Sequence, residues 1–205
     1  MKLLTGKTHT LGGMTLAAGL SLTGLCVPDT IANTVLWLGY LTAAGAGALL
    51  PDIDHRQSSV SHKHKVVAFF VNLFMGHRGF THTLLSLFLA SLLALLLVQL
   101  LPYPTTIYTV VGFLFGYASH IILDCLNPAG VPLFYPIKKD KISIGKIRTG
   151  GVVEFVIFLL LIIVFVFVIN QNAVVYHNVN IFGFIKQCIS YIKGNILPVI
   201  YSFLK

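Results

Sequence analysis

Long apolar runs restrict this chain to folds whose helices lie in lipid. Five runs approach the roughly 20 residues that an α-helix needs to cross a hydrocarbon core, and they cover residues 11–27, 31–50, 83–101, 106–123 and 152–169. No A-x-A cleavage site follows the first run, so we expect a retained helix rather than a signal peptide. Only 10% of the residues are charged, whereas soluble domains carry about 25%. The sequence therefore predicts an all-α, polytopic membrane bundle of about five transmembrane helices.

Two segments outside these runs need a separate interpretation. The apolar stretch near 62–76 is too short to cross a membrane, so we expect it to be interfacial or re-entrant. Residues 171–205 mix Asn, Lys, Ile and Phe around Pro198, which favours an amphipathic segment on the membrane surface. We accordingly expect a membrane-embedded domain over 1–170 and an interfacial segment over 171–205.

The basic residues predict how the bundle is oriented. The loops near 28–30 and 102–105 contain no Lys or Arg. Eleven of the fourteen basic residues lie on the opposite side, with the N-terminus and the loops over 50–82 and 125–150: Lys2, Lys7, Arg56, Lys63, Lys65, Arg78, Lys138, Lys139, Lys141, Lys146 and Arg148. Because loops rich in Lys and Arg stay in the cytoplasm, we expect a multi-pass protein whose N-terminus faces the cytoplasm.

The net charge of +8 raises the question of nucleic-acid binding. In a chain this apolar, basic residues instead set the topology and meet anionic lipid headgroups. The sequence has no basic recognition helix and no aromatic-basic motif. We therefore expect membrane lipids as partners and no nucleic acid, and the sequence leaves the oligomeric state open.

Histidines and carboxylates gather at the cytoplasmic ends of the predicted spans. Alternate threading of the helices brings the starts of the first and third spans and the ends of the second and fourth to one face. These four places hold His9, Asp52, Asp54, His77, His82, His120 and Asp124. Ionisable groups at membrane depth are costly and by default indicate a functional site. Since the orientation is inferred from Lys and Arg alone, this convergence is an independent observation.

A mixed set of imidazoles and carboxylates suits a divalent metal ion, with zinc as the first choice and manganese or magnesium as alternatives. His120 and Asp124 are four residues apart, so on a helix their side chains share one face. Alone, this spacing is more typical of a hydrogen-bonded polar pair, and Asp52 and Asp54 alone fit a helix end followed by a turn. A structural polar cluster and a proton path remain alternatives to the metal site.

A bound metal ion lowers the pKa of its coordinated water towards ~7, which makes hydrolysis the expected chemistry. Arg78 carries a planar guanidinium that suits a phosphate group, although it fits a topology-setting residue equally well. Glu154, just inside the fifth span, is a candidate ligand or general base, or else a buried partner of an Arg or Lys.

Four motifs together resemble a known family: KTHTLGG, LLPDIDH, HRGFTHTL and GYASHIILDCLNPAGVPLFYP. Over residues 1–155 the chain resembles the YdjM-like family of bacterial inner-membrane metal-dependent hydrolases, which is in turn similar to the zinc-dependent phospholipase C group. The resemblance implies hydrolysis of a phosphoester or phospholipid, with Asp54 as a ligand or base. The metal ligands that it implies are His9, Asp52, His77, His82, His120 and Asp124.

We therefore expect a metal-dependent hydrolase of the bacterial inner membrane that acts at the cytoplasmic interface on a phospholipid or another phosphorylated amphiphile. Asp54, Arg78 and Glu154 are its candidate catalytic residues. A non-enzymatic transporter or metal-handling protein with the same cluster is the alternative, and a scaffold with a structural metal is a third. Transport is disfavoured because the charged groups lie at one face rather than at mid-bilayer.

Overall fold

The computed structural model describes residues 5–23, 31–54, 80–101, 104–148 and 150–177, and the single residues 186, 189 and 190. Within these ranges the chain is all-helical and has no strand, only one antiparallel bridge between Val131 and Ile142. The expected all-α class is thus confirmed. The helices are α1 (Gly6–Ser21), α2 (Ile31–Gly47), the 3-10 helices η1 (Leu50–Asp54) and η2 (Phe80–His82), α5 (Leu84–Leu100), α6 (Pro104–Cys125) and α7 (Val152–His177).

Two of the sequence predictions fall on residues that are not described. The interfacial segment expected near 62–76 lies outside the described residues, as does most of 171–205. The boundary expected between 170 and 171 falls inside α7, which continues as one helix to His177. The division into two domains stays a prediction.

Two helices in the described part of the chain are long and apolar enough to cross a membrane, judged by length and composition. They span Thr106–Cys125 in α6 and Val152–Ala173 in α7. The apolar helix α5 is shorter, at 17 residues. Both α5 and α7 leave large apolar side chains exposed along most of their length. Such surfaces suit helices that face lipid, as the Leu-rich third run and the Ile-, Val- and Phe-rich fifth run predict.

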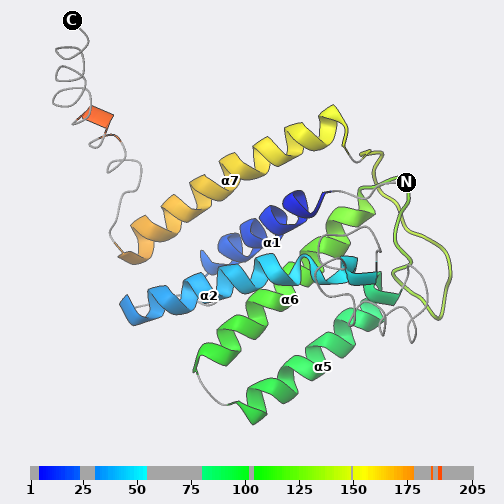
Figure 1. Ribbon diagram of the computed structural model, residues 1–205, viewed down its shortest axis with the longest axis horizontal. Coiled ribbons are helices and arrows are strands. Elements are labelled where there is room, and N and C mark those ends of the chain that lie inside the picture. The colour runs from blue at the N-terminus through cyan, green and yellow to red at the C-terminus, as the bar shows by residue number, and fades with distance from the viewer. Residues whose placement is uncertain are drawn as a thin grey trace, which may run out of the picture.

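Helix α6 is the centre of the bundle. It contacts α1, α2 and α5, whereas α7 packs on α1 at the opposite edge from α5 (Figure 1). The fully buried Tyr40 of α2 donates a hydrogen bond from its hydroxyl to the Ala17 carbonyl oxygen at 2.9 Å. The small residues of the first two spans predict that those helices pack centrally, which the structure confirms, and the structure adds α6 to them.

The close approach of α2 and α6 depends on Gly116. A Cβ atom at this position would collide with the carbonyl oxygen of Ala44 and crowd the backbone nitrogen of Ala48. Residues without a side chain allow helices to pack backbone against backbone, which is a common basis of helix association in membranes.

We expect Gly116→Ala to lower the thermal unfolding temperature of the detergent-solubilised protein, because overpacking a tight helix contact costs about 1–3 kcal/mol. The fluorescence of Trp37, the single tryptophan, measures this from within the core. Gly39→Ala on α2 is the matched control, since a Cβ there would meet no atom within 4 Å. Equal unfolding temperatures for the two variants would show that the contact tolerates a methyl group.

A polar network joins α1, α2 and α7 at the end of the bundle away from the start of α1. The hydroxyl oxygen of Ser21 lies 2.8 Å from Oδ1 of Asn172 and accepts a hydrogen bond from Nε1 of Trp37 at 3.3 Å. The Nδ2 atom of Asn172 donates to the carbonyl oxygens of Ala18 at 3.1 Å and Val168 at 2.9 Å. Because buried amide groups require partners, this network fixes α7 against α1.

Candidate metal centre

Five of the predicted ligand residues meet at one end of the bundle. His9 lies in the first turn of α1, Asp52 in η1, and His82 at the end of η2, while His120 and Asp124 lie one turn apart near the end of α6. His9, His120 and Asp124 are fully buried, and His82 and Asp52 are only 6% and 8% exposed. Segments from four regions of the chain therefore enclose one polar cluster, which we call the His/Asp cluster.

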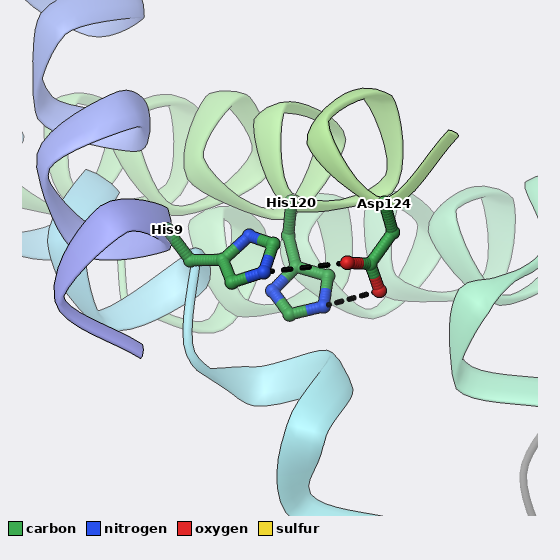
Figure 2. Close-up of side chains that lie close together, drawn as sticks. All are labelled: His9, His120 and Asp124. Atoms are coloured by element: carbon green, nitrogen blue, oxygen red, sulfur yellow. Dashed lines mark ion pairs between the residues drawn. The ribbon is translucent and has the colours of Figure 1, made fainter. Parts of the chain in front are cut away.

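The carboxylate of Asp124 is the centre of the His/Asp cluster. Its Oδ1 lies 3.3 Å from Nε2 of His9, and its Oδ2 lies 3.2 Å from Nε2 of His82 and 3.3 Å from Nε2 of His120. Figure 2 shows the His9 and His120 rings beside each other, both directed at this carboxylate. Their ring centroids are 3.9 Å apart and the rings are nearly parallel, at 19°.

Asp52 extends the cluster on the other side of His120. Its Oδ1 lies 3.8 Å from Nε2 of His120, and the Nε2 atoms of His82 and His120 are 3.2 Å apart. Two overlapping groups could therefore hold an ion, His9 with His120 and Asp124, and Asp52 with His82 and His120. In each group the potential ligand atoms lie within 4.8 Å of one another. His120 belongs to both groups.

These distances fit a metal ion. In a tetrahedral zinc site with Zn–N bonds of about 2.0–2.1 Å, neighbouring ligand atoms lie about 3.3–3.4 Å apart. The separations of 3.2–3.3 Å among Nε2 of His82, Nε2 of His120 and Oδ2 of Asp124 are close to this value.

The unsatisfied atoms of the cluster lead to the same conclusion. Among the described residues, both ring nitrogens of His9, both carboxylate oxygens of Asp124 and Oδ1 of Asp52 are buried without a hydrogen bond. Buried polar atoms are normally hydrogen-bonded, and a cation held by these lone pairs would satisfy several of them at once. The residues present thus fit a divalent ion.

Neighbouring groups orient two of the imidazoles. Nδ1 of His120 lies 2.6 Å from the carbonyl oxygen of Ala48. Since a carbonyl only accepts, Nδ1 carries a proton, so in the neutral imidazole the lone pair is on Nε2, which faces the cluster. Nδ1 of His82 lies 3.1 Å from the hydroxyl of Thr81. Such bonds to the second ring nitrogen are the usual way in which proteins fix metal-binding histidines.

Tyr117 supports η2, which carries His82. Its buried hydroxyl donates to the carbonyl oxygen of Thr81 at 2.7 Å. Neither Tyr117 nor the Ala48 carbonyl is among the site groups predicted from the sequence. A signal for Tyr117 exists, because positions 117, 120 and 124 are spaced to share one face of a helix. No side-chain pattern could have identified a backbone carbonyl.

The other predicted site residues fall into two classes. His77 and Arg78 lie outside the described residues, and for Asp54 only the backbone in η1 is described. Glu154 is described and buried, but none of its hydrogen bonds goes to the His/Asp cluster. Its Oε1 accepts from the Thr5 N–H at 2.7 Å and the Thr8 hydroxyl at 2.9 Å, and its Oε2 accepts from the Gly150 N–H at 2.6 Å.

Glu154 therefore joins the start of α7 to the start of α1, next to His9. The basic partner that the sequence allowed for Glu154 is not found in the described ranges; backbone N–H groups and a hydroxyl take its place. The roles of the individual residues as ligands or catalysts stay predictions. In the structure, Glu154 holds the start of α7 against the start of α1.

We expect Glu154→Ala to destabilise the protein by about 1–3 kcal/mol, because the buried Thr8 hydroxyl and two part-buried backbone N–H groups lose their acceptor. Glu154→Gln keeps an oxygen for Thr5 and Thr8 and loses the acceptor for the Gly150 N–H, so its unfolding temperature should lie between those of the wild type and the alanine variant. Thermal unfolding in detergent measures the series. An alanine variant as stable as the wild type would contradict this role for Glu154.

Comparison with known proteins gives a consistent set of relatives. A family model described as "YdjM inner membrane protein" matches residues 4–196. Inner membrane protein YdjM of Escherichia coli (strain K12) and that of Shigella flexneri are each 39% identical over 106 residues, which is 50% of this chain. Uncharacterized protein YvsG of Bacillus subtilis (strain 168) is 32% identical over 138 residues, 65% of this chain and 74% of the relative.

These matches cover only part of the first two relatives. The match covers about half the length of the E. coli and S. flexneri relatives, 52% of each. No solved structure matches the chain. The relatives' names place them in the inner membrane and assign no reaction.

Proposed function

The chain belongs to the YdjM inner membrane protein family, and we propose that this membrane protein is a metal-dependent hydrolase acting at the cytoplasmic face on a phospholipid or another phosphoester. The observation that carries the proposal is the arrangement of three imidazole Nε2 atoms within 3.3 Å of the buried Asp124 carboxylate. A chain with six acidic residues in total places two of them, Asp52 and Asp124, in this one cluster.

The residues that would hold the ion are His9, His82, His120 and Asp124, with Asp52 completing the second group. Imidazole and carboxylate ligands favour zinc, and manganese or magnesium are the alternatives. When bound, the ion would supply Lewis acidity and an activated water molecule at neutral pH.

The chain's own side chains prepare the site for this chemistry. The bond from His120 Nδ1 to Ala48 leaves the Nε2 lone pair available, and burial excludes bulk water, which strengthens electrostatic interactions. Asp52 and His82 are the least buried members of the cluster, so a substrate would approach from their side. Asp54 and Arg78 lie near these residues in the chain and are proposed as general base and phosphate-binding group.

We further propose that all five α-helices cross the membrane with the His/Asp cluster at the cytoplasmic face. Helices of 16–17 residues, such as α1, α2 and α5, are about 24–26 Å long, slightly shorter than the ~30 Å hydrocarbon core. The loop from α6 to α7 at the cluster end carries Lys138, Lys139, Lys141, Lys146 and Arg148, which favours a cytoplasmic position for this end.

Metal analysis of the purified protein tests the proposal first. Protein solubilised in detergent is stripped with a chelator, reloaded with zinc, manganese or magnesium, and measured by elemental analysis. Each preparation is then assayed on phospholipids and soluble phosphoesters. Stoichiometric metal together with metal-dependent turnover supports the hydrolase. Turnover that survives complete removal of metal contradicts it.

The full burial of His9, His120 and Asp124 favours a second candidate, a protein that holds or passes a metal ion without catalysis. Here tight metal binding would occur with no turnover of any phosphoester. Uptake of labelled zinc into proteoliposomes distinguishes a transporter from a scaffold with a structural metal.

A further inference from the structure

A pocket of about 360 Å³ lies at the junction of α1 and α7, apart from the ligand atoms of the His/Asp cluster. Its walls come from the start of α1, the turn before α7 and the first two turns of α7. The lining residues that matter here are Thr5, Lys7, Thr8, Glu154, Phe155 and Phe158. The volume is at the lower end of the ~300–1,000 Å³ range of small-molecule sites.

Lys7 contributes a positive charge to this lining. The Lys7 side chain is exposed, and no carboxylate among the described residues pairs with it. The negative charge of Glu154 is already engaged by the Thr5 N–H, the Thr8 hydroxyl and the Gly150 N–H. The junction thus binds one anionic group of its own chain and presents beside it an ammonium that no carboxylate in the described ranges pairs with.

The remaining wall is aromatic and lies at the boundary of the membrane segment. Phe155 and Phe158 are three residues apart in the first turns of α7, so they share one face of the helix. The apolar span of α7 begins at Val152, which places both rings near the headgroup level of the bilayer. Phe155 is 60% exposed, so the pocket has an apolar side that lipid can reach.

We propose that this pocket binds a membrane phospholipid, with the lipid phosphate at Lys7 and the first part of an acyl chain along Phe155 and Phe158. A cation beside an apolar wall at the membrane boundary matches the two chemical halves of such a lipid. The small volume suits the headgroup and adjoining methylene groups, while the rest of the chain stays in the bilayer. Thr8 is the chain neighbour of His9, so the bound lipid lies next to the α1 contribution to the cluster.

This lipid site requires neither a metal ion nor hydrolysis, so it can be tested separately from the proposed function. The probe is phosphatidylglycerol with a photoactivatable diazirine near the carboxyl end of one acyl chain. Full-length protein is reconstituted with it in nanodiscs of phosphatidylcholine, irradiated and digested, and the labelled residues are located by mass spectrometry. The measurement is made on chelator-treated protein and on zinc-loaded protein.

We expect labelling to concentrate on the segment around Phe155 and Phe158 and to be equal with and without zinc. Lys7→Gln should reduce it on the order of fivefold, the effect of one basic residue at an anionic lipid, whereas Lys7→Arg should retain it. Lys141→Gln, which removes an exposed lysine outside the pocket, is the matched control. Phe158→Ala should reduce labelling, and Phe167→Ala, further along the same helix, should not.

Three results would overturn the lipid site. Equal labelling in the Lys7→Gln and Lys141→Gln variants would mean that the probe reports general contact with lipid. Labelling spread evenly along α7 would mean the same. Suppression of labelling by millimolar inorganic phosphate would show a site for free anions rather than for a lipid. Trp37 fluorescence confirms that each variant is folded before its labelling is compared.

Discussion

Asp124→Asn is expected to remove the ion held by His9, His120 and Asp124 while the helical bundle stays folded. The substitution keeps the volume of the side chain and removes the charge that three imidazoles face at 3.2–3.3 Å. Changes in groups that merely support a metal ligand cost about 10–100-fold in affinity, so loss of the central carboxylate should exceed about 100-fold. Zinc titration of chelator-treated protein by calorimetry measures the affinity, and elemental analysis measures the stoichiometry.

Asp140→Asn is the matched control for this variant. Asp140 is an exposed carboxylate in the loop between α6 and α7, so its replacement removes one negative charge without touching the cluster. It should bind zinc like the wild type. A zinc affinity of Asp124→Asn equal to that of the wild type would contradict the group of His9, His120 and Asp124 as a metal site.

His120→Ala is expected to remove every bound ion, whereas His9→Ala should retain one. His120 belongs to both potential ligand groups, but His9 belongs only to the group around Asp124. The His120 variant also loses the bond to the Ala48 carbonyl, and an unsatisfied buried carbonyl costs about 1–3 kcal/mol. Its unfolding temperature should therefore fall in metal-free buffer as well. Metal content and metal-free unfolding temperatures are measured on the same preparations.

Comparison of these two variants also identifies the group that holds an ion. His120 has one lone pair free for a metal, at Nε2, so it can serve one group at a time. Zinc retained by His9→Ala at one equivalent would therefore be held by Asp52, His82 and His120. A His9→Ala protein without metal would contradict the independence of the group formed by Asp52, His82 and His120.

The helical architecture followed from the apolar runs, because a segment of about 20 apolar residues has few alternatives to a helix in lipid. The starts of the third and fifth runs agree with α5 and α7 to within one residue. Helix α1 begins earlier than expected and contains His9, since the polar stretch before the run is also helical. The central position of α6 was not predicted, because it depends on close backbone contacts at Gly112 and Gly116, and two glycines in a long apolar run are a weak signal.

The sequence predicts which residues gather in the candidate site but not the distances between them. Topology alone brings His9, His82, His120 and Asp124 to one face. His9 and His82 lie where α1 and α5 begin, and His120 and Asp124 lie near the end of α6, which is on the same side of the bundle. Distances within the set depend on rotation of the helices about their axes, which the apolar pattern of α5 and α7 leaves undetermined. Glu154 lies at the same end of the bundle as the cluster, yet it does not join it. Two of its three hydrogen bonds come from backbone N–H groups, which no residue pattern specifies.

The bond between Glu154 and the start of α1 has a consequence for the order in which the protein is made. Thr5 and Glu154 are 149 positions apart, so at a synthesis rate of about 5–20 residues per second their contact forms roughly 7–30 s after α1 has left the ribosome. During this interval α1 has already been made, while the side chain that anchors its start does not yet exist. Final placement of His9 is therefore a late event in biogenesis, completed only after α7 has begun to be made.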